Sequence, residues 1–316
     1  MFENKEQTSF DTYFSYLKSI SKCATDSVAE IDNFLDTITK NKAFKKIQTK
    51  KDLDLSKISK ILRNAWYTEF QMNQLSTTSE FAGFSLHWAQ VYAYYSCYLQ
   101  IRVYLLSQNQ IVNPKHLTTL RHFSQELDKR SKIFPHPWNL LCEKNPNDNL
   151  FINKKEIYTD IHQLSNLATL NPVDNFSKFL KTTRKREIEK KCNEWKIDNR
   201  KKRTPKNIKD KIIQNTPPTS IYDCLYRLRI RANYENADTF IFSQVSDHVA
   251  SEFHECLKNI VWISSLILET ISSKYLSSKN YKLILEDYKK NLENKNIDVN
   301  QLEPILRYEL IENRIK

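Results

Sequence analysis

Apolar side chains recur every three or four positions along much of the chain, the spacing that gathers them on one face of an α-helix. Two stretches show this most strongly, residues 84–105 and residues 249–267. In the first, the neighbouring positions are also apolar or aromatic, so we expect this helix to be covered on most of its circumference and to lie at the centre of the fold. Because both stretches share one spacing, we expect the two helices to pack closely and antiparallel. That arrangement predicts contacts of Tyr94 or Tyr98 with Cys256 or Ile260.

Weaker versions of the pattern fill most of the remaining chain. They predict helices within residues 5–50, 54–75, 116–130, 220–235 and 280–316. Residues 134–141 carry two prolines, so an ordered irregular segment is expected there.

Two pairs of residues match the capping pattern of helix starts, in which a hydroxyl precedes a carboxylate by three positions. They are Thr77 with Glu80 and Ser220 with Asp223. Helices are therefore predicted to begin close to residues 77 and 220.

These elements divide the chain into five consecutive units. They are an N-terminal helical extension (1–76), the first part of a helical core (77–140), a basic insertion (141–216), the second part of the core (217–278) and C-terminal helices (279–316). The insertion is inferred from a shift towards Asn, Lys, Thr and Asp with few large apolar residues, although residues 175–200 could be helical.

The glycine content favours helices throughout. The only glycine is Gly83, where average usage would give about 22. Phosphate-cradling loops, dinucleotide fingerprints and nucleophile elbows need glycines, so these sites are excluded. Tight hairpins also depend on glycine. We therefore predict an all-α protein, an antiparallel helical bundle with little strand.

Cysteine usage and hydropathy indicate a cytoplasmic protein. The six cysteines show no CxxC spacing, and no histidine pair has the spacing of a helical zinc site, so neither a metal nor another cofactor is expected. The longest stretch without Asp, Glu, Lys or Arg runs from residue 81 to residue 101 and contains a histidine, glutamines and four tyrosines. Such a stretch predicts a buried helix and no membrane span.

The positive charge is concentrated in one segment. The formal net charge is +12, and residues 181–211 carry fourteen basic and five acidic side chains. A solvated charge run is one interpretation of this segment. The other is nucleic-acid binding, because a tryptophan lies among the cations. The candidate binding residues are Arg184, Lys185, Arg186, Trp195, Arg200, Lys201, Lys202 and Arg203.

A second cluster of arginines lies on the helix predicted at residues 220–235. Arg227, Arg231 and Tyr234 are spaced i, i+4 and i+7, which places them on one stripe, while Arg229 points elsewhere. Guanidinium groups suit phosphate oxygens. The alternative is that carboxylates of neighbouring helices neutralise these arginines.

With its motifs in this order, the sequence resembles those of the HEPN superfamily, whose members are compact antiparallel helical bundles. The resemblance rests on HWAQVYAYYSCYLQIRVYLLSQN (87–109) and YRLRIRANYENAD (226–238), and covers about residues 80–140 and 217–278. It implies a role in bacterial defence or in a toxin–antitoxin-like system, with RNA or a protein of the same system as partner. It also implies a homodimer or a subunit of a larger assembly.

Ribonucleases of that family use an arginine and a histidine four to six residues apart, in a cleft between two protomers. Here no histidine follows within six positions of the three arginines. The resemblance carries over catalytic roles only to Arg227, Arg231, Asn233 and Tyr234. Neither an amide nor a tyrosine, with an ordinary pKa of about 10, is a good base near neutral pH. A nucleic-acid-binding module and a metal-independent ribonuclease therefore remain separate hypotheses.

Overall fold

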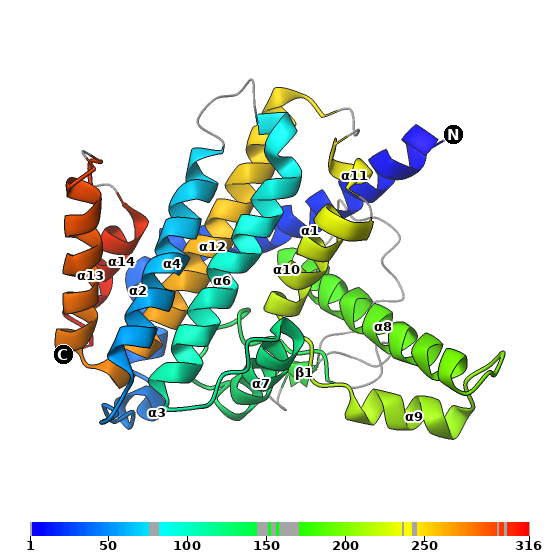
Figure 1. The fold of residues 1–316 in the computed structure, drawn as a ribbon, viewed down its shortest axis with the longest axis horizontal. Coiled ribbons are helices and arrows are strands. Elements are labelled where there is room, and N and C mark those ends of the chain that lie inside the picture. Colours follow the sequence, from blue (N-terminus) through cyan, green and yellow to red (C-terminus); the bar gives the residue numbers. More distant parts are fainter. Residues whose placement is uncertain are drawn as a thin grey trace.

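Three helices lie side by side at the centre of the computed structural model, two of them close together in the sequence and the third far from both (Figure 1). They are α4 (Leu55–Gln74), α6 (Leu86–Ser107) and α12 (Asp247–Leu276). The structure describes residues 2–75, 82–143, 151–152, 156–157, 171–235, 237–241, 245–295, 297–299 and 302–315. Most side chains of α6 are buried, as its apolar and aromatic circumference predicts.

The helix α4 runs antiparallel to α6. The Ser85 hydroxyl, just before α6, lies 3.4 Å from the carbonyl oxygen of Leu75 at the end of α4, and Ser96 Oγ lies 3.4 Å from that of Ala65 in the middle of α4. Numbers therefore rise along one helix as they fall along the other.

The helices α6 and α12, in contrast, run parallel. Ser85 Oγ lies 3.0 Å from His254 Nε2 at the start of both helices, and Gln100 donates to Glu269 (2.7 Å) towards their ends. Close packing is confirmed, whereas the antiparallel direction predicted for this pair is wrong. Well over one hundred residues separate the two helices, so the connecting chain is long enough to permit either direction.

The tyrosines of α6 do not face Cys256 as expected. Tyr94 and Tyr98 lie against His116, the first residue of α7 (His116–Lys129), with ring centroids 5.6 and 4.3 Å apart. Cys256 lies beside Ser21 of α1 (Phe2–Ala29) instead. Because α6 is covered on several sides, its periodicity did not determine which neighbour covers which side.

Helices before and after the central three extend the same hydrophobic core, which is one continuous cluster from Phe10 to Ile315. The helix α1 crosses α12, and Phe10 and Phe14 pack on Phe253. The remaining outer helices are α2 (Ile31–Thr39), α3 (Lys42–Lys45), α13 (Ser278–Glu293) and α14 (Glu303–Ile311).

An ion-pair network buried in this core was not expected from the sequence. Arg307 of α14 is fully buried and donates to Glu69 of α4 (2.7 and 2.8 Å) and to Glu269 of α12 (2.8 and 2.9 Å). Trp66 Nε1 also donates to Glu269 (2.8 Å). The network joins the C-terminal helices to the central ones.

The remaining elements of the described chain are η1 (Gly83–Ser85), β1 (Phe151–Ile152), β2 (Glu156–Ile157), α8 (Pro172–Asp198), α9 (Lys206–Asn215), α10 (Ile221–Ile230), η4 (Arg231–Glu235) and α11 (Asp238–Ile241). Of these, α8, α10 and η4 contribute to the candidate site. Each named strand has two residues, and helices dominate the described chain, so the all-α prediction is confirmed. The irregular segment at 134–141 is also as expected, with Phe134 and Trp138 buried.

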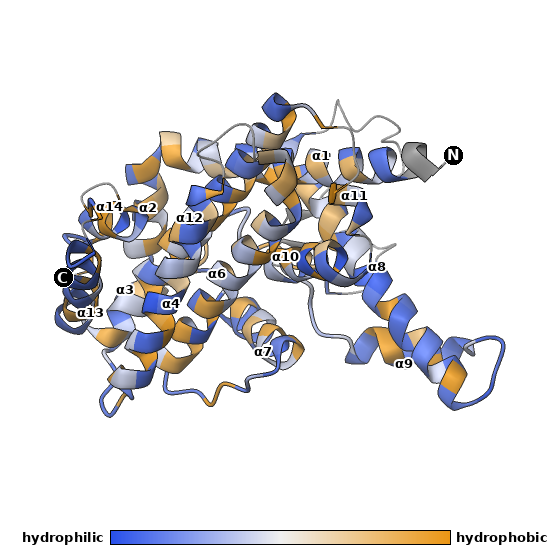
Figure 2. Cartoon of the chain, turned by 45° about the horizontal axis from the view of Figure 1, so that its top comes forward, coloured by the Kyte–Doolittle hydropathy of each residue, from blue (hydrophilic) through white to orange (hydrophobic). Residues whose placement is uncertain are grey.

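The helices described within the predicted insertion at 141–216 lie in two different environments. The first half of α8 packs against α1, with Phe176, Phe179 and Leu180 fully buried. The second half and α9 project from the molecule as a helical hairpin with a largely hydrophilic surface (Figure 2). The low density of large apolar residues indicated the exposed hairpin, but it gave no indication that the first half of α8 is buried.

Candidate functional site

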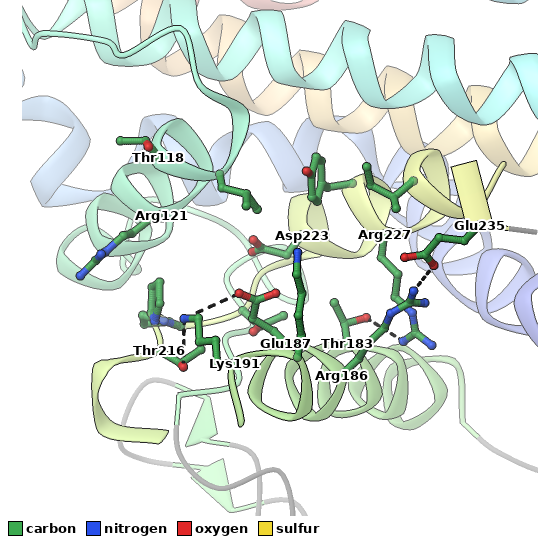
Figure 3. Close-up of a pocket in the computed structure, with 17 residues that line it drawn as sticks. Thr118, Arg121, Thr183, Arg186, Glu187, Lys191, Thr216, Asp223, Arg227 and Glu235 are labelled. Carbon is green, nitrogen blue, oxygen red and sulfur yellow. Dashed lines mark hydrogen bonds and ion pairs between the residues drawn. The ribbon is translucent and has the colours of Figure 1, made fainter. Parts of the chain in front are cut away.

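A pocket of about 340 Å³ lies between α7, α8, α10 and the segment 216–219 (Figure 3). Its cationic lining residues are Arg121, Arg186, Lys190, Lys191 and Arg227, and its acidic ones are Glu187, Asp223 and Glu235. The pocket combines one side of the predicted arginine helix with part of the basic segment.

The carboxylate of Asp223 serves the helix rather than a ligand. Its Oδ2 accepts from the backbone N–H of Ser220 (2.7 Å), the Ser220 hydroxyl (2.8 Å) and the Ser124 hydroxyl (3.3 Å). Burial raises the pKa of this carboxyl. The capping pattern predicted at residue 220 is confirmed, while the pattern at Thr77 and Glu80 lies outside the described residues.

Neutral hydroxyl groups hold Arg227 in place. Its Nη1 donates to Thr182 (3.0 Å) and Thr183 (3.1 Å) of α8, and its Nη2 donates to the Tyr13 hydroxyl (2.8 Å) of α1. The guanidinium also lies 5.3 Å from the centroid of the Tyr13 ring. These contacts orient the group without cancelling its charge.

Arg231 is held in the same way. It donates to the Tyr13 hydroxyl (2.8 Å) and to the Ser9 hydroxyl (3.3 Å), and lies 4.8 Å from the centroid of the Tyr13 ring. One buried phenol oxygen thus accepts from both arginines. No carboxylate within the described ranges forms an ion pair with Arg227 or Arg231.

A third guanidinium, that of Arg186, joins this group from α8. It forms an ion pair with Glu235 at the pocket rim (Figure 3). Burial and the positive charges of Arg227 and Arg231 lower its pKa, an effect that the Tyr13 hydroxyl partly offsets. Three guanidiniums therefore lie around Tyr13 with the Glu235 carboxylate, and two of them, Arg186 and Arg227, line the pocket.

Tyr234 does not lie on the predicted stripe with Arg227 and Arg231. The turn η4 is π-helical, and its wider turn moves residues away from the positions that a regular α-helix would give them. Tyr234 lies beside Arg229 instead, with its hydroxyl 3.5 Å from that guanidinium. Asn233 is half-buried on the same turn and lines neither this pocket nor the cavity near His116.

Arg229 is enclosed by tyrosine rings on the other side of α10. Its guanidinium lies 5.3 to 6.0 Å from the ring centroids of Tyr94, Tyr95, Tyr226 and Tyr234. It also donates to the Tyr95 hydroxyl (3.1 Å). Arg229 is only 9% exposed, and its charge is stabilised by the ring faces and hydroxyl groups of these tyrosines.

A histidine of α7, His116, lies beside the tyrosine rings that enclose Arg229, and the sequence did not indicate it as a site residue. His116 Nδ1 lies 2.7 Å from the Tyr94 hydroxyl, and its ring centroid is 5.5 Å from that of Tyr95. Burial lowers the pKa of His116, and the positive charges of Arg229 and Arg102 lower it further. The tyrosine-rich run at 92–98 was the available signal, but only the fold brings it to α7.

The predicted nucleic-acid-binding residues separate into three environments. Arg184 is fully buried and donates to the backbone carbonyls of Pro217 (2.6 Å) and Ile213 (3.1 Å). Its assignment to a binding surface is therefore wrong, because this side chain ties α8 to the end of α9. Arg186 lines the pocket. The others lie on the exposed part of α8 and its hairpin turn, namely Lys185, Trp195 (half-buried), Arg200, Lys201, Lys202 and Arg203.

Comparison of the chain with protein-family models, curated proteins and solved structures found no match. Among the described residues, no group of three or more His, Cys, Asp or Glu side chains is placed to hold a metal ion. The described helices also include none with the length and hydropathy needed to cross a bilayer.

Proposed function

We propose that this protein binds nucleic acid, with RNA as the ligand, by holding phosphate groups in the pocket between α8 and α10. The observation that carries the proposal is that Arg186 and Arg227 line the pocket, that Arg231 shares the Tyr13 hydroxyl with Arg227, and that an ion pair is formed only by Arg186, with Glu235, among these three arginines of the described chain. Cations held close together repel one another, which raises the free energy of the fold until an anion binds between them. Guanidinium groups also offer paired donors to phosphate oxygens.

The hairpin of α8 and α9 supports a polymeric ligand. Its exposed cations continue from the pocket along α8, where Lys190 and Lys191 line the pocket edge. A chain of phosphates could therefore follow one surface from the pocket to the hairpin turn. The resemblance to the HEPN superfamily adds RNA as the partner, a role in bacterial defence or a toxin–antitoxin-like system, and a homodimeric assembly.

Fluorescence anisotropy of labelled single-stranded RNA tests the pocket. Replacing Arg227 and Arg231 by glutamine keeps a polar side chain as far as the position of Nε, but removes two charges and the two hydrogen bonds to Tyr13. Affinity should fall by about 10- to 100-fold, and the slope of log K against log salt should decrease by about 1.4, if each arginine holds one phosphate.

The matched control removes two exposed charges from α13, as Lys279→Ala with Lys290→Ala. This variant has the same net charge as the pocket variant, so a loss of affinity common to both would reflect net charge alone and reject the pocket. Thermal unfolding of each variant verifies that the fold is retained.

A second candidate function is metal-independent RNA cleavage, and the position of His116 favours it. A lowered pKa keeps the imidazole neutral near pH 7, the form that accepts a proton, and Arg229 lies within electrostatic reach. Incubation of RNA in EDTA should then give products that His116→Ala abolishes even at protein concentrations that saturate the RNA. Intact RNA under these conditions, with the native partner also added, would leave the binding function alone.

A further inference from the structure

The most exposed aromatic side chains of the described chain lie on or beside α6. Among large hydrophobic residues with high exposure, the aromatic ones are Phe84 (80%), Trp88 (49%) and Tyr234 (69%). Phe84 precedes α6, Trp88 lies in its first turn, and Tyr234 is on η4, which packs against α6. Such side chains cost free energy in water, so their clustering calls for a partner.

Trp88 begins a row of aromatic residues along α6. Trp88, Tyr92 and Tyr95 are spaced i, i+4 and i+7, and the first two ring centroids are 6.4 Å apart. The Arg229 guanidinium then lies 5.4 Å from the Tyr95 ring and 5.3 Å from the Tyr234 ring. We call Trp88, Tyr92, Tyr95 and Tyr234 the aromatic strip.

A cavity of about 430 Å³ opens beside this strip. Its lining residues are Asn64, Thr68, Val91, Tyr92, Tyr95, Tyr98, Leu99, Arg102, Pro114 and His116. The lining contains ring faces, amide and hydroxyl groups and one arginine, but no carboxylate. The Arg102 Nε is buried without a hydrogen-bond partner in the described structure. This combination suits a flat, polar-edged ring attached to an anion.

The cavity adjoins the phosphate pocket of the proposed function. His116 lines the cavity and the next residue of α7, Leu117, lines the pocket. Tyr226 also lines the pocket, and its ring centroid lies 6.3 Å from that of His116. The rings of His116 and Tyr226 therefore lie between the cavity and the cationic lining of the pocket, as sugar lies between base and phosphate in a nucleotide chain.

We infer that the aromatic strip and its cavity stack the unpaired bases of single-stranded nucleic acid. The inference rests on the proposed function, because the phosphates of the same strand occupy the pocket between α8 and α10. Bases in a duplex are already stacked and cannot reach tyrosine or tryptophan rings, whereas unpaired bases can. The ligand class is thus a single strand, with little dependence on base identity.

The test compares three labelled ligands by fluorescence anisotropy: a single-stranded RNA, the same length with abasic sites, and the duplex of the first strand. The single strand should bind at least about tenfold more tightly than either of the others. Trp88→Ala with Tyr92→Leu should weaken binding of the base-carrying strand by about tenfold or more, and should leave the abasic strand unaffected.

Leu283→Ala provides the matched control, because Leu283 is 60% exposed on α13, away from α6 (Figure 1). Equal binding of abasic and base-carrying strands, or wild-type affinity of the strip variant, would overturn base stacking while leaving the phosphate pocket intact. A strip variant that changes only the sedimentation coefficient would instead assign the strip to contact between copies of the chain, and would also overturn the inference. The proposed function is rejected by a different result, namely wild-type RNA affinity of the variant in which Arg227 and Arg231 are replaced by glutamine.

Discussion

Buried arginines of this protein are held by three kinds of partner. Arg307 meets two carboxylates, Arg184 meets backbone carbonyl oxygens, and Arg229 meets tyrosine rings. Only the first partner neutralises the charge. Arg307 therefore stabilises the core, Arg184 closes the connection between two helices, and Arg229 retains positive charge next to the cavity.

The carboxyl of Glu69 should make stability depend on pH. Burial raises its pKa to about 6 from the ordinary value of 4.5, although the Arg307 charge opposes the shift. The folded chain then binds more protons than the unfolded chain between about pH 4.5 and 6, so this contribution to stability is present at low pH and is lost as pH rises. Relative to wild type, Glu69→Gln should gain about 1–2 kcal/mol between pH 5 and pH 7 in urea unfolding.

The control for removing a carboxylate is Glu286→Gln, at an exposed position of α13. A Glu69→Gln curve that runs parallel to that of wild type across this range would contradict the titration of Glu69 in the folded state.

Sequence reasoning located the arginine-rich helix but not the environment of each side chain. It placed Arg227 and Arg231 together correctly, because regular helical spacing holds up to the start of η4. It misplaced Tyr234, because a π-helical turn leaves no clear mark in the sequence. It also assigned Arg184 to the surface, since a charge run gives no sign that one of its members is buried.

Helix ends in this protein use residues other than glycine in the left-handed region. Asn109 (φ 62°) follows α6 and Arg200 (φ 50°) follows α8, and each is followed by an N–H that bonds back to the last turn (3.2 and 2.9 Å). Both ends are Schellman motifs, where glycine is the usual residue. Near-absence of glycine therefore did not prevent these turns, but left strain in them.

The largest strain of this kind is expected at Ser277, between α12 and α13, where φ is 76° and ψ is 146°. This region strongly favours glycine. Ser277→Gly should raise the free energy of unfolding by about 0.5–1 kcal/mol, because relief of strain exceeds the loss of the cap to Asn280 and the added freedom of the unfolded chain.

Ser277→Ala removes the same capping hydroxyl and keeps the strain, so it should lower stability by about 1 kcal/mol. Thermal unfolding of the two variants measures the difference. If the glycine variant is no more stable than the alanine variant, the backbone at this position is not strained.

Periodicity predicted the long helices well and their mutual directions poorly. The stretches at 84–105 and 249–267 lie within helices much as expected, because burial on one face requires that spacing. The spacing is the same whichever way a helix runs, so it contains no information on the parallel packing of α6 and α12. The buried half of α8 was missed because its apolar residues are confined to a short stretch within a polar segment.

The whole molecule has a strongly uneven charge distribution. Of the +12 net charge, 14 − 5 = 9 charges lie in residues 181–211, most of which form the second half of α8, α9 and the turn between them. This hairpin projects from the bundle on the side of the pocket (Figures 1 and 2). Such a distribution attracts anionic polymers over long range and directs them towards the pocket.

Replacing Arg200, Lys201, Lys202 and Arg203 by alanine should weaken binding to all RNA sequences alike, by about 10-fold or more at low salt. Association rates from stopped-flow fluorescence should fall more than dissociation rates rise, since exposed charges act mainly on encounter. Unchanged affinity at low salt would show that the hairpin is only a solvated charge run.

The network around Arg307 also constrains the order in which the chain can fold during synthesis. Glu69 precedes Arg307 by 238 residues. Until the ribosome has added Arg307, packing α4 against α12 would bury two carboxylates that lack their cation, which is strongly unfavourable. We therefore expect the final packing of the central helices to form only after residue 307 has been synthesised.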